Sequence, residues 1–232
     1  MITIPNFNER CVGKLGNKMF LLAAAIGLAK ENNDEVVLSP GKYADLFPMI
    51  RQGNTYPEVI YKEKRYEYDK IPYTCNMGLK GYFQSWKYFR NAEYEIRECF
   101  DFCFGEQINA TSVHVRRGDY VGNKHYVDLY EDTDYYIKAM SKEYGRIIVF
   151  SDDIEWCKKR IKGANIGFAE GDEIADMKEM ARCNKHIIAN SSFSWWGAWL
   201  GYGKVIYPKQ WFGEKYSNLS TVDLIPNSWE GL

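Results

Sequence analysis

Three short segments of the sequence place charged or hydroxyl side chains directly after an apolar run. They are His114-Val115-Arg116-Arg117-Gly118-Asp119-Tyr120, Ser151-Asp152-Asp153 and Asn190-Ser191-Ser192-Phe193. Arginine is always charged, and its planar guanidinium can donate two hydrogen bonds to phosphate oxygens. Serine hydroxyls and the backbone N–H groups at the start of a helix also bind anions. Together, these residue types are typical of a site for a phosphate-bearing ligand.

The two adjacent arginines are expected to act differently. Side chains of neighbouring strand residues point to opposite faces, or in different directions where a strand ends. One arginine can therefore meet a ligand while an acid such as Asp119 holds the other. We predict that Arg116 clamps a pyrophosphate. Taken alone, the Arg116–Arg117 pair is also consistent with two solvated charges after a strand.

The other two segments allow a structural interpretation beside the functional one. Asp152 and Asp153 could receive a ribose diol or a base N–H, or they could cap the helix that follows. Ser191 and Ser192 could bind an anion and could also cap the next helix, and these two roles are compatible. The local sequence leaves these alternatives open.

The second half of the chain contains the elements that would position these segments. Short apolar runs alternate with stretches that are typical of helices. We predict strands over residues 112–116, 146–150, 165–168, 185–189 and 204–207. We predict helices over residues 134–144, 153–161, 173–183 and 193–200, with Ser151 or Asp152 capping the second. This alternation predicts a parallel sheet wrapped by helices, with the three polar segments along the edge where its strands end.

The first half of the chain shows a weaker pattern. We predict a helix over residues 19–32, a strand over 35–38 and a helix over 87–104, and we interpret residues 50–78 as irregular. Gly13-x-x-Gly16-Asn17 precedes the first helix. It either lets the backbone approach a phosphate or sugar, or forms a simple turn. The regular alternation of apolar runs and helix-like stretches begins near residue 108, which predicts two structural halves.

The composition excludes some classes of partner. The 232 residues carry 30 basic and 31 acidic side chains, so the net charge is −1. Such a chain has no overall positive field to attract nucleic acid or an anionic membrane. The longest apolar run, residues 19–29, is too short to span a bilayer, and the chain does not begin with a signal-peptide pattern. We therefore expect a soluble, cytoplasmic protein without a transmembrane segment.

The sequence offers little material for a metal site. It has three histidines and six cysteines without a Cys-x-x-Cys pair, and we interpret the cysteines, Cys99 and Cys103 included, as reduced core residues. Asp132-Thr133-Asp134 imitates a metal-binding Asp-x-Asp motif, but it lies at a predicted helix start and is interpreted as a cap. The tryptophans within residues 195–199 are interpreted as helix packing.

Several motifs occur in the order found in a known enzyme family. Between about residues 13 and 212, the chain resembles glycosyltransferase family 11, the α-1,2-fucosyltransferases, and more distantly the α-1,6- and protein O-fucosyltransferases. The His114–Tyr120 segment carries this resemblance most strongly. The further matching blocks are Gly81-Tyr82-Phe83-Gln84-Ser85, Phe150–Cys157, Ile188–Trp199, Val205-Ile206-Tyr207-Pro208 and Trp211-Phe212.

The resemblance implies an α/β fold of GT-B type, with two Rossmann-like halves whose parallel sheets face a central cleft. The halves are expected at residues 1–108, on the acceptor side, and at 109–232, which would hold GDP-fucose. Whether the last segment packs back on the first half is left open. The resemblance also implies inverting, metal-independent transfer of fucose to the 2-hydroxyl of a galactose in a glycan acceptor. The resemblance implies GDP-fucose as the donor substrate and implies no cofactor.

The resemblance further assigns roles to residues. The implied catalytic residues are His114, Arg116, Arg117 and Asp119. The implied donor-binding residues are Asn17, Asp152, Asp153, Asp176, Ser191, Ser192 and Phe193. Within these sets, Arg116 matches an arginine that grips the β-phosphate, and Asp176 matches an aspartate that reads guanine. No residue is assigned to a metal.

The chain departs from the family pattern in its first half. The family's Gly-Asn-Gln is Gly16-Asn17-Lys18 here, and the half that should shape the acceptor site is short. The general base is either Asp119, unless that residue holds Arg117, or a first-half carboxylate such as Asp45. Two other functions stay open: transfer of another nucleotide sugar or in another linkage, and binding of a nucleotide sugar or glycan without turnover.

Overall fold

The computed structural model describes residues 1–54, 56–102, 105–143 and 145–232. Cys103 and the ends of the predicted helices 87–104 and 134–144 lie outside these residues. The described chain forms two compact units. The first consists of Met1–Phe102 and Ser220–Pro226, and the second consists of the remaining described residues.

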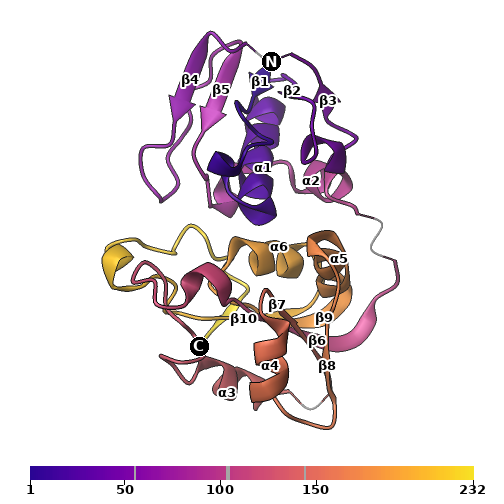
Figure 1. The fold of residues 1–232 in the computed structure, drawn as a ribbon. Coiled ribbons are helices and arrows are strands. Elements are labelled where there is room, and N and C mark those ends of the chain that lie inside the picture. Colours follow the sequence, from indigo (N-terminus) through magenta and orange to yellow (C-terminus); the bar gives the residue numbers. More distant parts are fainter. Residues whose placement is uncertain (55, 103–104, 144) are drawn as a thin grey trace. The chain divides into compact units, whose positions relative to one another are not determined.

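The first unit is built on a five-stranded parallel sheet in the order β3-β2-β1-β5-β4 (Figure 1). Its strands are β1 (Ile2–Thr3), β2 (Val36–Leu38), β3 (Arg51–Gln52), β4 (Val59–Lys62) and β5 (Met77–Lys80). Helix α1 (Leu15–Glu31) packs against β1, β2 and β5, and it is buried nearly all round because it is apolar on most of its surface. Helix α2 (Glu93–Cys99) contacts α1.

The first unit differs from the prediction in two places. Residues 50–78 are not irregular, because they contain β3, β4 and the start of β5. The side chains of β3 and most of those of β4 are exposed, so these strands lack the apolar run that marks a buried strand. The predicted helix over residues 87–104 is confirmed only over Glu93–Cys99. A 3-10 turn at Trp86–Tyr88 precedes α2, and between them Asn91 donates a hydrogen bond to the Gly27 carbonyl.

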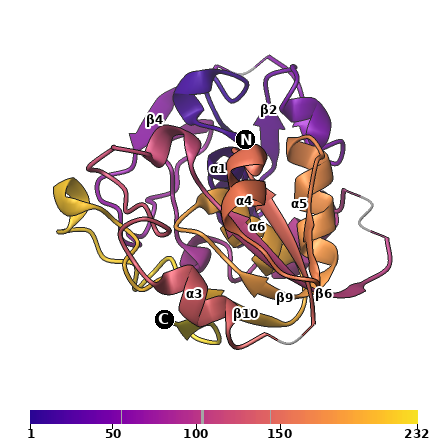
Figure 2. The ribbon, with the colours of Figure 1, turned by 60° about the horizontal axis from the view of Figure 1, so that its bottom comes forward.

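The second unit is built on a six-stranded parallel sheet in the order β11-β10-β9-β6-β7-β8. Its strands are β6 (Ile108–Val115), β7 (Arg146–Ser151), β8 (Ile166–Phe168), β9 (Cys183–Ile187), β10 (Lys204–Tyr207) and β11 (Glu230–Gly231). Helices α5 (Glu173–Arg182) and α6 (Ser192–Leu200) cover one face, and α3 (Tyr135–Met140) and α4 (Ile154–Arg160) cover the other (Figures 1 and 2). The predicted parallel sheet wrapped by helices is confirmed.

Strand β6 divides the core of the second unit into two layers. Val113 and Val115 belong to a buried cluster with residues of α3 and α4. His114 points to the opposite face, where its ring lies 5.6 Å from that of Phe193 on α6. The alternation follows from the two-residue period of a strand. It decides which side chain at the end of β6 turns toward α6.

The tryptophans of α6 pack inside the second unit, as predicted. Trp195 and Trp196 are fully buried, with 5.0 Å between their ring centroids. The ring of Trp229, near the end of the chain, lies 5.3 Å from that of Trp195. Because Trp195 and Trp196 are fully buried and Trp199 is half-buried, these indoles do not form an exposed sugar platform.

One predicted helix cap is corrected, and the predicted cap within Asp132-Thr133-Asp134 is confirmed at Thr133. Helix α4 is capped by Asp153, whose carboxylate accepts the N–H of Trp156 at 3.3 Å, and not by Ser151 or Asp152. At the start of α3, the hydroxyl of Thr133 accepts the N–H of Tyr135 at 3.2 Å. Asp134 makes no capping bond and instead pairs with Lys138.

The described cysteines are free thiols. Cys99, Cys157 and Cys183 are buried as predicted, whereas Cys11 and Cys75 are exposed. Among the described residues, no group of three or more His, Cys, Asp or Glu side chains is arranged to hold a metal ion. No helix in the described ranges is long and apolar enough to cross a membrane.

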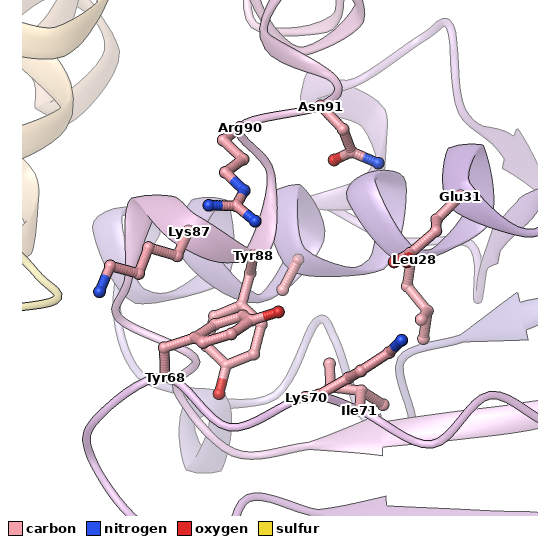
Figure 3. A pocket seen from close by; sticks show the side chains of 10 residues that line it. Leu28, Glu31, Tyr68, Lys70, Ile71, Lys87, Tyr88, Arg90 and Asn91 are labelled. Carbon is pink, nitrogen blue, oxygen red and sulfur yellow. The ribbon is translucent and has the colours of Figure 1, made fainter.

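A recess of about 190 Å³ opens in the first unit beside the C-terminal half of α1 (Figure 3). Its lining includes Leu28, the rings of Tyr68 and Tyr88, and the cationic side chains of Lys70 and Arg90. Pockets for small molecules usually measure about 300–1,000 Å³. The recess is smaller than these, and none of the predicted site residues lines it.

Candidate functional site

Two loops at the centre of the second sheet carry most of the predicted site. The strand order reverses between β6 and β9, and sheets of this kind bind ligands at the carboxyl ends of the strands at such a switch point. The hydroxyl of Tyr120, after β6, donates to the carbonyl of Asn190, after β9, at 2.9 Å. Because β6, β7 and β9 are parallel, the three polar segments lie along one edge, which confirms the prediction.

Arg116 is oriented by two carboxylates. Its Nη1 lies 3.0 Å from Oδ2 of Asp152, and its Nη2 pairs with Oδ1 of Asp119. Its guanidinium also lies over the ring of Tyr120, with 5.4 Å between Cζ and the ring centroid. An arginine that is already held in this way loses little further conformational freedom when it binds a phosphate.

Arg117 is held by a different acid from the one considered in the sequence. Its Nη1 lies 2.9 Å from Oδ2 of Asp128, and its guanidinium stacks on Trp156 at 3.8 Å. Asp119 pairs with Arg116, so the alternative in which Asp119 holds Arg117 is wrong. Sequence reasoning missed Asp128. Its position between the buried Val127 and Leu129 was the available signal, because a charge within an apolar run needs a partner.

Asp152 holds the backbone of the arginine loop as well as Arg116. Besides its pair with Arg116, its Oδ1 accepts the backbone N–H of Arg117 at 2.8 Å. Gly118 makes this approach possible. Its φ is +26°, and a Cβ atom at this position would lie 2.3 Å from Oδ2 of Asp152. Both oxygens of Asp152 are thus used within the loop, and Asp153 caps α4. Direct contact of either acid with a donor stays a prediction.

His114 supports the site as an uncharged ring. Burial, reinforced by the charge of Arg116, lowers the pKa of His114 to about 3. Its Nδ1 is buried and has no hydrogen-bond partner within the described part of the chain. Its backbone carbonyl accepts the hydroxyl of Tyr136 at 2.7 Å, which fixes the end of β6. A histidine with this pKa does not exchange protons near neutral pH, so it can pack and position but cannot act as an efficient base.

The start of α6 faces the same switch point. Ser191 caps the helix, and its hydroxyl accepts the N–H of Phe193 at 3.3 Å. The helix begins at Ser192 and is nine residues long, so its first turn carries the positive end of the helix dipole. The predicted cap is confirmed, and it leaves Ser192 in the first turn, where backbone N–H groups can bind an anion.

Asp176 carries an acceptor atom without a donor. It lies in the first turn of α5, which is capped by Asp172 and not by Asp176. Its Oδ1 is buried and makes no hydrogen bond to any residue that the structure describes. Burial raises the pKa of Asp176 to about 6, although the nearby backbone amide of Gly171 lowers it in part. A buried carboxylate oxygen that lacks a partner is costly, so this position suits a ligand that supplies an N–H group.

Two of the residues considered in the sequence belong to the first unit. Asn17, in the first turn of α1, accepts a hydrogen bond from the side-chain amide of Gln84 at 2.8 Å. Asp45 is exposed and accepts from the side chain of Gln52 at 3.2 Å. The structure therefore groups Asn17 with Gln84, a residue from the Gly81–Ser85 block for which the sequence suggested no role.

Known proteins similar to this chain are glycosyltransferases. An α-1,2-colitosyltransferase of Escherichia coli is 32% identical over 92% of this chain and 85% of that protein. A galactoside 2-α-L-fucosyltransferase, Sec1, of Mus musculus is 27% identical over 87% of this chain and 66% of that protein. Among solved structures, fucosyltransferase NodZ from Bradyrhizobium aligns with a TM-score of 0.48 and 13% identity, over 80% of this chain and 90% of that chain.

The family model described as glycosyl transferase family 11 matches residues 53–215. This range includes the loops after β6, β7 and β9, where the charged residues converge. The identity to the E. coli protein extends over most of both chains. The chain therefore belongs to glycosyltransferase family 11.

Proposed function

We propose that this glycosyltransferase transfers fucose from GDP-fucose to a β-galactoside, in α-1,2 linkage and with inversion at the anomeric carbon. The observation that carries the proposal is the switch point of the second sheet, where Arg116 and the start of α6 can bind one pyrophosphate. The names of the E. coli and mouse relatives support the α-1,2 linkage and the galactoside acceptor.

The reaction would proceed as a single displacement. The acceptor hydroxyl oxygen forms a bond to the anomeric carbon while the bond from that carbon to the β-phosphate oxygen breaks. GDP leaves with the electron pair, and the hydroxyl proton passes to a base on the opposite face of the sugar. Arg116 and the N–H groups at the start of α6 would stabilise the charge that grows on the leaving phosphate.

Asp119 fits a supporting role better than the role of general base. Its contact with Arg116 puts it beside the arginine that would hold the leaving phosphate. The base of an inverting displacement acts on the opposite face. We therefore assign Asp119 to the orientation of Arg116 and expect the base among carboxylates on the acceptor side.

The similarity to the colitosyltransferase favours a second candidate donor. Colitose is fucose without its 3-hydroxyl group, so the two GDP-sugars present the same base, phosphates and methyl group. A donor site that reads mainly these shared parts would accept both sugars. The second candidate function is therefore α-1,2 transfer of colitose.

Incubation with GDP-sugars and an array of β-galactosides, read by mass spectrometry, tests the proposal. GDP-fucose and GDP-colitose compete for the enzyme, and UDP-galactose serves as the control donor. We expect a fucosylated product that a linkage-specific α-1,2-fucosidase removes. Preferential transfer of colitose would move the assignment to the second candidate. Binding of GDP without transfer to any galactoside would contradict both and favour a non-catalytic binding protein.

The Asp176→Asn variant tests guanine recognition. Guanine presents N1–H and an exocyclic amine side by side, and a carboxylate can accept from both. Asparagine keeps the shape but replaces one acceptor with a donor, so we expect GDP affinity to fall by about 1.5–3 kcal/mol. Calorimetric titration with GDP, UDP and ADP measures this loss and the expected loss of base selectivity. Glu173→Gln removes another acid from the first turn of α5 and is the control. Unchanged GDP affinity in Asp176→Asn would reduce Asp176 to a helix-end charge.

GDP affinity should also depend on pH through Asp176. Because the pKa of this carboxyl is raised to about 6, the group is protonated in the free protein at lower pH. Binding of guanine to the carboxylate then requires loss of that proton, so affinity should fall as the pH drops below about 6 and level off above it. Titrations at pH 5, 6 and 7.5 should show this fall in the wild type and a smaller one in Asp176→Asn. The phosphates of GDP titrate alike in both proteins, so equal pH profiles would contradict the assignment.

Transfer should not require a divalent metal ion. The guanidinium of Arg116 and the start of α6 can together stabilise the charge of the leaving group. We expect the initial rate to persist in excess EDTA. A rate that collapses in EDTA and returns with Mn²⁺ or Mg²⁺ would contradict this mechanism.

A further inference from the structure

The first sheet has a switch point of its own, with a polar cluster beside it. The strand order of this sheet reverses between β1 and β5. The loop after β5 contains Gln84, and helix α1, which follows the loop after β1, contains Asn17. Gln84 donates from Nε2 to Asn17 at 2.8 Å and accepts from the Tyr66 hydroxyl at 3.2 Å. Side-chain groups from three parts of the chain thus meet where parallel sheets bind ligands.

The loop from Gly81 to Gln84 is held in a strained backbone conformation. Phe83 is fully buried and has a φ of +51°, which is rare for a residue with a bulky side chain. Such strain costs about 1–3 kcal/mol and persists only where the surroundings enforce it, often at functional sites. The conformation at Phe83 therefore needs a structural cause nearby.

The cause is the carboxylate of Glu63, which follows β4. Its two oxygens accept the backbone N–H groups of Tyr82, at 2.7 Å, and of Phe83, at 2.8 Å. Gly81 has a φ of +154°, and a Cβ atom there would lie 2.4 Å from Cβ of Glu63. Only glycine allows the loop to come this close. Glu63 and Gly81 together impose the turn that directs Gln84 toward Asn17.

We propose that this cluster binds the glycan acceptor, with Gln84, Asn17 and Tyr66 contacting sugar hydroxyls and Glu63 acting as the positioning residue that holds the loop of Gln84. Asn17 then serves the acceptor, and not the donor as the resemblance implies. The inference rests on the proposed function, because it takes the acceptor to be a neutral β-galactoside. The residues joined by hydrogen bonds are two amides and a phenol, which suit hydroxyl groups better than a phosphate.

Two neighbouring side chains support a sugar ligand. Tyr82, two residues before Gln84 in the same loop, is 47% exposed. Aromatic rings commonly pack against the C–H face of a sugar, while their polar ends stay hydrated. The indole N–H of Trp86, two residues after Gln84, is buried and has no hydrogen-bond partner among the described residues. The 3-10 turn that follows the loop thus contains a donor that the described part of the chain leaves unsatisfied.

Two variants and one matched control test the proposal. Glu63→Gln keeps the size of the side chain but places an N–H₂ group where an acceptor is needed. One of the two backbone N–H groups then loses its acceptor. Gln84→Ala removes the amide and leaves the backbone of the loop in place. Glu58→Gln makes the same chemical change just before β4, on an exposed side chain bound to Asn76. Lactose is the acceptor probe.

We expect Glu63→Gln and Gln84→Ala each to raise the KM for lactose about tenfold or more, which corresponds to loss of a hydrogen bond in a desolvated site. The affinity for GDP, measured by calorimetry, should stay within about twofold of the wild type in both variants. Glu58→Gln should change neither quantity. A purely structural role for Glu63 would instead lower stability and GDP affinity together with the turnover.

Saturation-transfer NMR of lactose in the presence of GDP separates this proposal from the proposed function. Lactose that binds the wild type without being fucosylated would contradict the function and leave this site standing. Lactose binding that is equal in the wild type, Glu63→Gln and Gln84→Ala would overturn the site and leave the function standing. A wild-type protein that gives no saturation transfer to lactose or to any galactoside of the array would also overturn it.

Discussion

We expect Arg116→Lys to lower kcat about 100-fold or more, the scale set by the loss of one preorganised donor to a developing charge. Lysine keeps the charge but has no planar fork. It cannot donate to phosphate while it also keeps the two carboxylate contacts of Arg116, to Asp119 and Asp152. The loss should fall on kcat, because the charge on the phosphate grows as the bond to fucose breaks.

The measurement is steady-state kinetics with GDP-fucose and lactose, together with a thermal melt. Arg146→Lys is the matched control, since Arg146 begins β7 and is exposed at the opposite end of that strand from Asp152. The Arg116 variant should melt near the wild-type temperature, because its charge still pairs with the carboxylates. Near-normal turnover in Arg116→Lys would remove this residue from the catalytic role.

The second large effect concerns stability. We expect Asp128→Asn to lower the free energy of unfolding by about 3 kcal/mol, the low end of the range for breaking a buried ion pair. The side chains of Arg117 and Asp128 are only 9% and 11% exposed, so the guanidinium would remain buried without its main counter-charge. Glu131 lies 4.0 Å from Arg117 but is nearly half exposed, and it compensates only in part.

A double variant distinguishes the loss of the ion pair from simple damage to the turn. The Oδ1 of Asp128 accepts the N–H groups of Tyr130 and Glu131, both at 3.2 Å, and asparagine can preserve these bonds. Replacing both partners of a buried pair costs less than replacing one. Arg117→Met with Asp128→Asn should therefore be more stable in urea unfolding than Asp128→Asn alone. Additive losses in the two single variants and the double variant would contradict this account.

Features that depend only on neighbouring residues, such as the ends of buried strands, could be predicted from the sequence. The apolar runs before Arg116, Asp152 and Asn190 predicted three strand ends of one parallel sheet, and the structure has them there. A buried strand can be predicted locally, because it needs a short apolar run whatever its neighbours in the sheet are. The same logic failed for β3 and β4, whose exposed side chains carry no such run and whose strands exist through pairing with their neighbours.

The partners of the charged residues were decided by the tertiary structure. Arg117 could have paired with Asp119, two residues away, yet it pairs with Asp128 and stacks on Trp156. The turn at Gly118 meanwhile lets Asp152 approach the loop. In the same way, Glu63 meets the N–H groups of Tyr82 and Phe83 only because β4 and β5 are paired in register. Composition and spacing determined which residue types were available and at which edge of the second sheet they lie. The ion pairs and hydrogen bonds among them depend on strand order, register and loop closure, which bring distant segments together and leave no local pattern in the sequence.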